Sequence, residues 1–409
     1  MKILIVTQYF WPEAFRINDL AVDLTIRRHE VTVLTGMPNY PSGCFFKGYG
    51  LFFPAKEFYK GLNVVRVPLI PRGNGKWWRL VLNYLSFALC ASVLGPFRCQ
   101  GKYDQIFVYQ PSPVTVGLPA LILKKLKDTP IVFWVQDLWP ESLSATGFTK
   151  SAWLIKVVSQ FVRFIYTRCD CILVQSQGFI PEVIALGGSP QKIKYFPNWA
   201  ESFYHPVKVD KDSPERDEFP KGFRILFGGN VGNAQSFETI LDAADRLKLH
   251  PEIHWMIIGD GHRRLWLEKE IHERNLSETV HVLGRRAPET MPRYFALADA
   301  LLVSLRKDPV FAKTIPSKVQ SYLACGRPVI ASLEGEGAKV VDESGAGIVC
   351  EPENGGLLAK AALTLSRTSE ETRNLMGEKG RLYYEKHFER DMLIGVLEGV
   401  LSHQILRKT

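Results

Sequence analysis

A chain of 409 residues is too long for a single hydrophobic core, so its length predicts two domains of roughly 200 residues each. Its 46% hydrophobic and 23% charged residues exclude a disordered or fibrous chain and are typical of a globular protein. The formal net charge of +9 comes from the first half, where residues 1–200 hold 22 Lys and Arg against 11 Asp and Glu. This asymmetry predicts an anionic partner, and since no nucleic-acid-binding motif is apparent, a membrane surface is favoured over nucleic acid.

The first half alternates apolar strands with loops and helices, which is the pattern of a doubly wound α/β domain. Ligands bind at the carboxyl ends of the strands in such a sheet, so the loops that follow the strands are the expected binding loops. The first two strands are followed by loops 8–18 and 37–43, and the third by a basic, glycine-containing turn at Pro71–Lys76. The expected strands are 2–7, 31–36, 62–68, 104–109, 131–135, 171–175 and 193–196.

Residues 80–97 contain no charged side chain, and these 18 residues fall slightly short of the about 20 that a membrane-spanning helix needs. A span here would place neighbouring strands of one sheet on opposite sides of a membrane. We therefore expect a helix that packs on the sheet or lies in the membrane interface. Trp77 and Trp78, with Lys76 and Arg79 beside them, suit the lipid headgroup boundary. A helix that is merely buried in the core is the alternative.

Two acidic residues, Asp137 and Glu141, follow the strand at 131–135 and lie among large apolar residues. Two acids among large apolar residues at the carboxyl end of a strand are candidates for a functional site, although Asp137 could equally be the N-cap of the next helix. A linker begins at Pro197, and the polar, proline-bearing segment 207–220 marks a domain boundary. A second series of strands and helices follows it.

Neither a secretion signal nor a metal-binding motif is apparent. Residues 1–10 are typical of a strand and contain no small-residue cleavage site. The seven cysteines show no zinc-site spacing and are expected to be reduced thiols of a cytosolic protein. The D-x-D sequence Asp210-Lys211-Asp212 lies in the linker and not at a strand end, so no metal cofactor is expected.

The second half is organised around residues 223–247, FRILFGGNVGNAQSFETILDAADRL, which predict a buried strand, a glycine-rich turn and an amphipathic helix. Such a turn lets backbone amides approach an anion at the start of the helix. A tight connection without a ligand is equally consistent with this stretch alone. The turn matches neither the dinucleotide pattern nor the P-loop, and QYFWPEAF follows the first strand, which argues against a dinucleotide-dependent oxidoreductase.

Further motifs follow in order: IIGDG at 257–261, VLGR at 282–285, IPSKVQSYLACGRPVIAS at 315–332 and GAGIV at 345–349. Together with residues 223–241 they resemble the carboxyl half of glycosyltransferase family 4. The sequences MKILIVTQYFWPE, HEVTVLTGMPNYPSG and FWVQDLWPESL resemble the amino half of its O-antigen amino-sugar transferase subgroup, which includes N-acetyl-L-fucosamine transferases.

The resemblance implies a GT-B fold, in which two Rossmann-like doubly wound domains face each other across a cleft and a C-terminal helix crosses back to the first. The implied domains are a membrane-facing, acceptor-binding domain at 1–200, a nucleotide-sugar-binding domain at 201–385 and the helix at 386–409. The implied reaction is retaining transfer of a sugar, of the N-acetylated deoxyamino type, from a UDP-sugar to an undecaprenyl-diphosphate-linked saccharide in O-antigen or surface polysaccharide synthesis. We expect a peripheral or monotopic protein at the cytoplasmic face of the inner membrane.

The chain departs from the family where the donor diphosphate is bound. Asn230 and Gln235 replace the Arg and Lys of the glycine turn, Lys313 and Ser321 replace the paired glutamates, and Gln136 replaces the His of a His-Asp pair. A diphosphate needs cations or hydrogen-bond donors. We therefore expect Lys318, in the first turn of a helix that begins near Ser317, to supply the charge. A solvated surface lysine is the alternative, and Ser317 could be only an N-cap.

In a retaining front-face reaction the leaving phosphate can take the acceptor proton, so Asp137 is expected to position a sugar hydroxyl. A nucleotide-sugar-binding protein without transferase activity is the alternative function. No cofactor is expected apart from the UDP-sugar substrate. The expected catalytic residues are Asp137, Lys318 and Glu141. The expected donor-binding residues are Gly229, Asn230, Gly232, Gln235, Gly259, Gly261, Arg285, Ser317, Ser321 and Tyr322. The expected acceptor-binding residues are Arg16, Asn18, Asn39, Tyr40 and Gln110.

Overall fold

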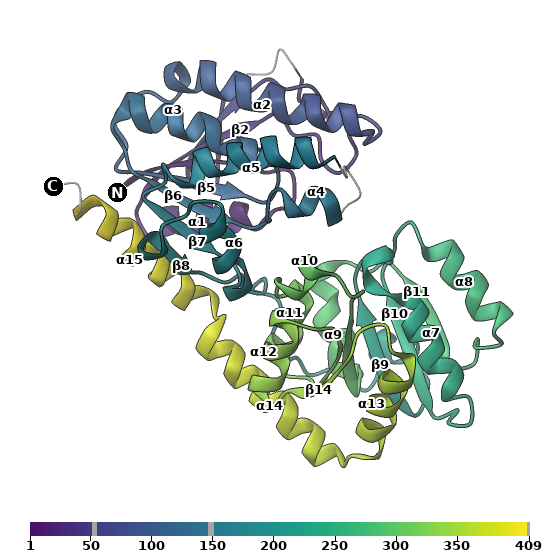
Figure 1. Ribbon diagram of the computed structural model, residues 1–409. Helices are drawn as coiled ribbons and strands as arrows, with labels where there is room; N and C mark the ends of the chain where they lie inside the picture. The colour runs from purple at the N-terminus through teal and green to yellow at the C-terminus, as the bar shows by residue number, and fades with distance from the viewer. Residues whose placement is uncertain (51–54, 146–150, 407–409) are drawn as a thin grey trace. The chain divides into compact units, whose positions relative to one another are not determined.

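The computed structural model describes residues 1–50, 55–145 and 151–406, which form two compact α/β units (Figure 1). The first unit comprises residues 1–196 and the chain from Ile394 onward, and the second comprises Pro197–Leu393. The division thus falls before Pro197, and not after residue 200 as expected. The reason is packing: Ala200 belongs to a buried core cluster of the second unit, and the Asn198 carbonyl accepts a hydrogen bond of 2.7 Å from Gln320 Nε2.

Within the described residues, the first unit contains an eight-stranded sheet in the order β3-β4-β2-β1-β5-β6-β7-β8. Strand β3 pairs antiparallel with β4 at one edge, and the remaining pairs are parallel. The apolar sequences of the central strands agree with burial on both faces. The strands are β1 (Lys2–Val6), β2 (Glu30–Gly36), β3 (Lys56–Tyr59), β4 (Leu62–Val67), β5 (Gln105–Gln110), β6 (Ile131–Val135), β7 (Cys171–Val174) and β8 (Ile193–Tyr195).

Helices cover both faces of this sheet. On one face, α2, α3 and α5 bury a continuous core that includes Phe87, Leu123 and Ile165. At the amino edge of the sheet, α15 joins the unit: Gln105 Nε2 donates to the Leu401 carbonyl at 2.9 Å, and Glu398 accepts from Arg27 at 3.1 Å. The expected return of the C-terminal helix to the first domain is thus confirmed. The helices are α1 (Arg16–Ile26), α2 (Trp77–Arg98), α3 (Gly117–Lys127), α4 (Glu141–Ala145), α5 (Ala152–Tyr166), α6 (Ile180–Ala185) and α15 (Arg390–Leu406).

The second unit contains, among the described residues, a six-stranded parallel sheet in the order β11-β10-β9-β12-β13-β14. Helices α7, α8 and α13 bury one face, and α9, α11, α12 and α14 bury the other. The strands are β9 (Phe223–Gly228), β10 (Ile253–Ile258), β11 (Val280–Gly284), β12 (Ala300–Ser304), β13 (Val329–Ser332) and β14 (Gly347–Cys350). The helices are α7 (Phe237–Arg246), α8 (Arg264–Glu273), α9 (Met291–Leu297), α10 (Pro309–Ala312), α11 (Ser317–Ala324), α12 (Glu336–Ser344), α13 (Gly355–Arg367) and α14 (Glu370–His387).

Each sheet reverses its strand order once, between β1 and β5 in the first unit and between β9 and β12 in the second. At such a reversal the connecting helices leave toward opposite faces of the sheet and open a crevice at the carboxyl ends of the strands. Loops 8–15 and 229–236 lead away from these two points. The topology therefore confirms two doubly wound domains and directs attention to these loops.

Candidate donor and acceptor sites

The glycine turn after β9 is built by close backbone approach. The Gly229 amide donates to the Ile258 carbonyl at 2.8 Å, and the Val231 amide donates to the Asp260 carbonyl at 2.9 Å. A Cβ on Gly259 would lie 1.7 Å from the Gly229 carbonyl oxygen, so only glycine fits there. The two expected glycine segments therefore lie together. The amides of Gly229 and Val231 are therefore already used within the fold and are not available to an anion.

Lys318 reaches this turn from α11. A Cβ on Gly229 would lie 2.7 Å from Lys318 Cε and 3.2 Å from its Nζ, so the ammonium group lies directly against the turn. Its Nζ is 3.5 Å from the centroid of the Phe227 ring. Loss of hydration lowers the pKa of Lys318 to about 7. Among the described residues no carboxylate pairs with it. Lys318 is thus part-buried beside the expected site, and not solvated at the surface.

Asn230 and Gln235 line the same turn without adding charge. The amide of Asn230 folds over the turn, since a Cβ on Gly232 would lie 2.5 Å from Asn230 Nδ2, and one on Gly261 2.8 Å from its Oδ1. Gln235 Oε1 is buried and has no hydrogen-bond partner among the described residues. An unsatisfied buried acceptor costs free energy unless a ligand supplies a donor. Gln235 therefore marks a place where a ligand hydroxyl or amide could bind.

A charged cluster near the turn was not expected from the sequence. Glu238, in the first turn of α7, accepts from Arg263 at the start of α8 and from Arg306 after β12, the latter at 3.0 Å. The Arg306 amide also donates to the Ala234 carbonyl at 2.8 Å. Two arginines against one carboxylate leave positive charge at the carboxyl edge of the sheet. The sequence could have indicated this cluster, because Glu238, Arg263 and Arg306 all lie within a few positions of the end of a strand or helix.

The remaining residues that we expected to bind the donor lie in α11 or in the loop after β11, and not in the glycine turn itself. Ser317 is the first residue of α11, Pro316 occupies the N-cap position, and no side chain caps the helix, so the N-cap interpretation of Ser317 is wrong. Ser321 Oγ donates within the helix to the Ser317 carbonyl at 3.1 Å. Tyr322 lies beneath the turn, where its hydroxyl accepts from the Gly228 amide at 3.0 Å. Arg285 is exposed after β11. Tyr322 supports the turn from the core side, whereas Arg285 is open to solvent.

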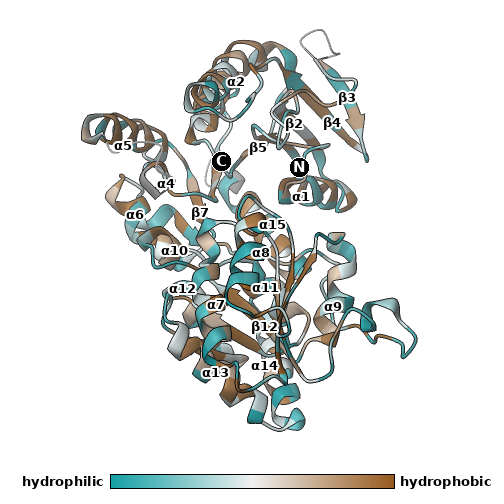
Figure 2. Ribbon diagram, turned by 90° about the vertical axis from the view of Figure 1, so that its right-hand side faces the viewer, coloured by the Kyte–Doolittle hydropathy of each residue, from teal (hydrophilic) through white to brown (hydrophobic). Residues whose placement is uncertain are grey.

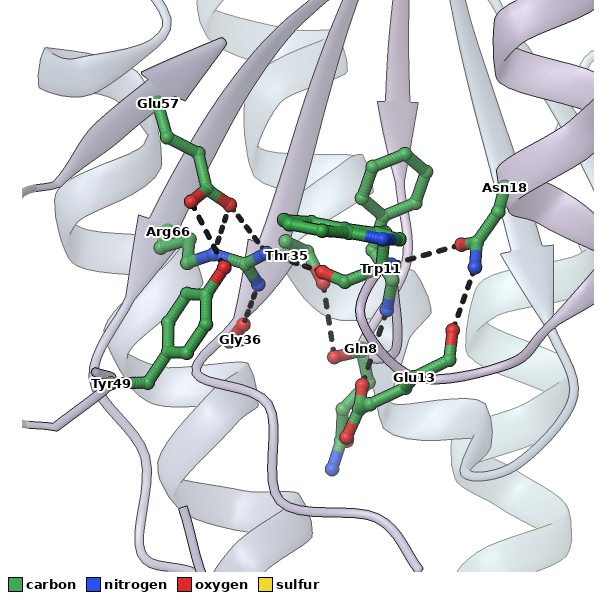
Figure 3. A network of polar contacts seen from close by, with 10 residues as sticks. Gln8, Trp11, Glu13, Asn18, Thr35, Gly36, Tyr49, Glu57 and Arg66 are labelled. Carbon is green, nitrogen blue, oxygen red and sulfur yellow. Dashed lines mark hydrogen bonds and ion pairs between the residues drawn. The ribbon is translucent and has the colours of Figure 1, made fainter. Parts of the chain in front are cut away.

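In the first unit, a buried glutamate joins the two expected acceptor loops. Figure 3 shows this residue, Glu13, on the first of them. Glu13 Oε1 accepts from the amides of Asn39 and Tyr40, each at 2.8 Å, and Oε2 accepts from the Phe10 amide at 3.2 Å. Burial raises the pKa of Glu13 to about 7, against the opposing effect of these three amides. Loops 8–18 and 37–43 are therefore one structure, held together by a residue that the sequence did not single out.

Arg66 supports this structure from β4 (Figure 3). Its side chain has no exposed area, donates to Glu57 on β3, and donates to the Gly36 carbonyl at 2.9 Å and the Trp11 carbonyl at 2.5 Å. The guanidinium also lies 4.9 Å from the centroid of the Tyr49 ring. A lone arginine in the apolar strand LNVVRV was the signal that could have predicted a buried polar network here.

The expected acceptor residues divide into supporting and accessible groups. Asn18 Oδ1 accepts from the Trp11 amide at 3.0 Å, and buried Asn39 Oδ1 accepts from the Arg72 amide at 3.1 Å. Both side chains therefore shape the loops. Tyr40 is 38% exposed and packs against Tyr9, with ring centroids 5.8 Å apart. Arg16 is the part-buried first residue of α1. Of these four residues, Tyr40 is the one that presents an aromatic surface to a ligand.

Gln110 and Asp137 meet where β5 and β6 end. Gln110 Nε2 donates to the Asp137 carbonyl at 3.2 Å, and Gln110 Oε1 is buried without a partner among the described residues. The Asp137 carboxylate accepts from the Ser142 hydroxyl, and burial raises its pKa to about 6. Glu141 begins α4 and is part-buried. Asp137 and Gln110 thus form a polar pair at the carboxyl ends of β5 and β6, next to the strand reversal, and one side-chain oxygen of Gln110 has no partner among the described residues.

Within residues 1–50, 55–145 and 151–406, no three or more His, Cys, Asp or Glu side chains cluster in a way that could hold a metal ion. At the second unit's site, Lys318, Arg263 and Arg306 supply positive charge.

Comparison with known proteins identifies both units. Residues 14–199 match a glycosyl transferase 4-like domain, and residues 208–383 match a domain of the glycosyl transferases group 1. The chain is 26% identical over 346 residues to a putative colanic acid biosynthesis glycosyl transferase, WcaI, of Escherichia coli K12, which covers 82% of this chain and 84% of that protein.

Two solved structures share the fold. Sucrose-phosphate synthase from Thermosynechococcus elongatus superposes with a TM-score of 0.72 over the full length of both chains, at 16% identity. Anabaena Alr3699/HepE in complex with UDP and glucose has a TM-score of 0.70 at 17% identity, covering 98% of this chain and 100% of that one. The chain is therefore a glycosyltransferase of the group 1, GT-B type, in which a glycosyl transferase 4-like domain precedes the group 1 domain.

Proposed function

We propose that this chain transfers a sugar from a UDP-sugar to a saccharide linked to undecaprenyl diphosphate, with retention of anomeric configuration, in the synthesis of O-antigen or another surface polysaccharide. The transferred sugar is of the N-acetylated deoxyamino type. The proposal draws on the E. coli relative, whose name assigns it to colanic acid synthesis, and on HepE, which was solved with UDP.

The observation that carries the proposal is the part-buried ammonium of Lys318 beside the Gly229 turn, with no carboxylate partner among the described residues. A buried cation without a counter-charge is costly unless a ligand supplies an anion. The diphosphate of a UDP-sugar has that charge, and Lys318 would stabilise it as the leaving group without a divalent ion. Arg263 and Arg306 add positive potential at the same edge of the sheet.

In the first unit, Gln110, Asp137 and Tyr40 are suited to a saccharide acceptor. Gln110 Oε1 is a buried acceptor without a hydrogen-bond partner among the described residues, and Gln110 Nε2 donates to the backbone carbonyl of Asp137. We assign Asp137 to fixing an acceptor hydroxyl, while the leaving phosphate takes its proton. Glu141 is the second acidic candidate for the same task.

The first unit also has the features of a membrane-bound surface. Among the described residues, α2 alone is long and apolar enough to cross a membrane, and only 28% of its apolar stretch is buried. One side packs on the sheet through Phe87, Ala91 and Gly95, and the other exposes apolar side chains. The ribbon of α2 has brown, hydrophobic segments along its length in Figure 2. We define the apolar stripe of α2 as Leu82, Leu85, Leu89, Val93 and Phe97, which are 40–74% exposed. Trp153, on α5, is 72% exposed. We propose peripheral or monotopic attachment to the cytoplasmic face of the inner membrane through this surface.

A donor-hydrolysis and transfer assay tests the proposed function. Purified protein is incubated with UDP-sugars, with and without an undecaprenyl-diphosphate-linked saccharide, and UDP release and product are measured. We expect UDP release to depend on the acceptor and to be lost in Lys318→Met. A nucleotide-sugar-binding protein without transferase activity is the alternative, and it would bind UDP-sugar without forming product under any acceptor condition.

A further inference from the structure

The basic turn between β4 and α2 is a candidate anion site that the donor and acceptor assignments leave unused. Arg72, Lys76 and Arg79 fall within eight consecutive positions, and none of them pairs with a carboxylate among the described residues. Lys76 is exposed, and the two arginines are part-buried. Three neighbouring cations without counter-charges repel each other, so an anionic ligand would relieve that repulsion.

Close backbone contacts hold this turn in place. The Gly73 amide donates to the Gly43 carbonyl at 2.8 Å. A Cβ on Gly43, which has φ +79°, would lie 1.8 Å from the Gly73 carbonyl oxygen, so glycine is required at that contact. The Arg79 side chain packs on the turn, since a Cβ on Gly73 would lie 3.3 Å from its Cδ. These contacts therefore hold the turn against loop 37–43.

Arg72 directs this charge toward the accessible acceptor residue. Its Nη1 donates to the Tyr9 hydroxyl at 2.9 Å, and its guanidinium carbon lies 5.0 Å from the centroid of the Tyr40 ring. A guanidinium has five N–H donors, and one is used by Tyr9. The others can bind phosphate oxygens in the bidentate geometry that arginine favours. Arg72 thus adjoins Tyr40, on the expected acceptor loop.

On the other side, the turn leads directly into α2. Trp77 is 65% exposed, and the guanidinium carbon of Arg79 lies 4.8 Å from the Trp78 ring centroid. The apolar stripe of α2 continues away from this end. A ligand with a diphosphate between a sugar and a long apolar chain would match this order of surfaces: aromatic and polar at Tyr40, cationic at the turn, and apolar along α2.

We propose that Arg72, Lys76 and Arg79 bind the diphosphate that joins the acceptor saccharide to its polyprenyl chain. This assignment rests on the proposed function for the identity of the acceptor. It gives the first unit its own diphosphate site, separate from the donor diphosphate site of the second unit. Tyr40 then contacts the saccharide nearest to the diphosphate, and the lipid chain follows the apolar stripe.

Binding of farnesyl diphosphate tests this site without requiring turnover. Calorimetric titration is made in detergent-free buffer with excess UDP, which keeps the donor site from capturing the probe. We expect Lys76→Gln with Arg79→Gln to weaken binding at least about tenfold, as loss of charge-assisted hydrogen bonds predicts. The matched control, Lys125→Gln with Lys194→Gln, removes two exposed charges elsewhere in the unit and should bind as the wild type does. No binding by the wild type, or equal binding by the double variant, would overturn the proposal.

Two further measurements distinguish the acceptor diphosphate from membrane phospholipid as the ligand, and failure of this proposal from failure of the proposed function. If the double variant loses binding to phosphatidylglycerol vesicles but still binds farnesyl diphosphate, the turn recognises bulk phospholipid and the proposal is wrong. In transfer assays, KM for a short-chain diphosphate acceptor should be at least about tenfold higher for the double variant than for the wild type. KM for the same saccharide on a neutral alkyl chain should be unchanged. Equal loss with both acceptors would contradict a diphosphate site. Absence of transfer by the wild type would refute the proposed function, and the farnesyl diphosphate result would still stand.

Discussion

Lys318 Nζ lies 3.5 Å from the centroid of the Phe227 ring, at the end of the strand that leads into the Gly229 turn. The ring face attracts the ammonium but does not neutralise it, and such contacts contribute about 0.5–2 kcal/mol. Because loss of hydration lowers the pKa of Lys318 to about 7, the free protein holds this residue close to the point of deprotonation. An anion that binds at the turn would restore the charged form. The pair therefore links donor binding to protonation.

Replacing Lys318 with an apolar side chain should separate stability from activity. Lys318→Met is expected to lower kcat/KM at least about tenfold, a loss of ~1.4 kcal/mol of transition-state stabilisation. The same change should raise Tm, because it removes a part-buried ammonium, by about 2–4 °C for each kcal/mol gained. Steady-state kinetics and calorimetry of the purified variant measure both. A folded Lys318→Met protein with wild-type kinetics would defeat the assignment.

The affinity for UDP-sugar should weaken as pH rises through about 7. The folded-state pKa of Lys318 is depressed, so in the free protein the cation is present below about pH 7 and lost above it, whereas the donor diphosphate stays ionised throughout. Binding then takes up a proton, and Kd should rise by up to about tenfold for each pH unit above 7. Lys318→Arg keeps its charge at every pH tested. Titrations from pH 6 to pH 9 should therefore show a slope for the wild type and none for the arginine variant.

Sequence patterns predicted the strand, turn and helix at the second unit's site because these three elements are consecutive in the chain. A strand, a glycine turn and a helix were expected over 223–247 and are present as β9, the turn and α7. The expected placement of Lys318 beside the turn is also present, since both lie at strand or helix ends of one sheet edge. The two clusters that were missed depend on which charged side chains the fold brings together, and strand and helix patterns do not encode that pairing. Glu238 meets Arg306, and Arg66 meets Glu57 on β3, an edge strand whose charged sequence KEFY lacks the apolar signal of a central strand.

Asp137→Asn should lower turnover more than donor binding. The backbone carbonyl of Asp137 accepts from Gln110 and its carboxylate accepts from Ser142, so removal of the carboxylate charge would change how an acceptor hydroxyl is held. We expect kcat to fall at least about tenfold while Kd for UDP-sugar stays within about twofold. Ser142→Ala, which removes the neighbour and keeps the carboxylate, is the control and should retain more activity. A parallel loss of donor affinity in Asp137→Asn would assign the residue to the donor site.

Glu13→Gln should change how the thermal stability depends on pH. The pKa of Glu13 is raised from 4.5 to about 7, so between these values the folded protein keeps a proton that the unfolded chain releases. Stability of the wild type therefore falls as pH rises through this window and levels off above it. Glutamine keeps an oxygen for the Asn39 and Tyr40 amides but cannot ionise.

Calorimetry at pH 5 and pH 8 measures this effect. The Tm of Glu13→Gln minus the Tm of the wild type should be larger (more positive) at pH 8 than at pH 5. Asp23→Asn, on α1 in the same unit, controls for a general effect of removing an acid. The same difference at both pH values would mean that Glu13 is ionised throughout.

Membrane attachment should depend on the tryptophans at the start of α2. Anionic lipid attracts the basic first half by about 1 kcal/mol for each basic residue close to the surface, and exposed Trp77 and Trp78 add apolar area at the headgroup depth. Salt should therefore release only part of the protein, because screening weakens the charge term and leaves hydrophobic insertion. Trp77→Glu with Trp78→Glu is expected to move the protein to the soluble fraction. It should also slow transfer to a lipid acceptor in vesicles and spare transfer to a short soluble acceptor.

The control for this double variant is Leu265→Glu, which places a charge on an 81% exposed apolar residue of α8 in the second unit. It should sediment with membranes as the wild type does, since α8 has charged residues around its exposed side and no continuous apolar stripe. Sedimentation of the double tryptophan variant with membranes at wild-type levels would assign attachment to another surface, of which α5 with exposed Trp153 is the next to test. Loss of soluble-acceptor activity in the same variant would instead indicate that the substitutions disturb the adjoining basic turn, because Arg79 packs on both Trp78 and Gly73.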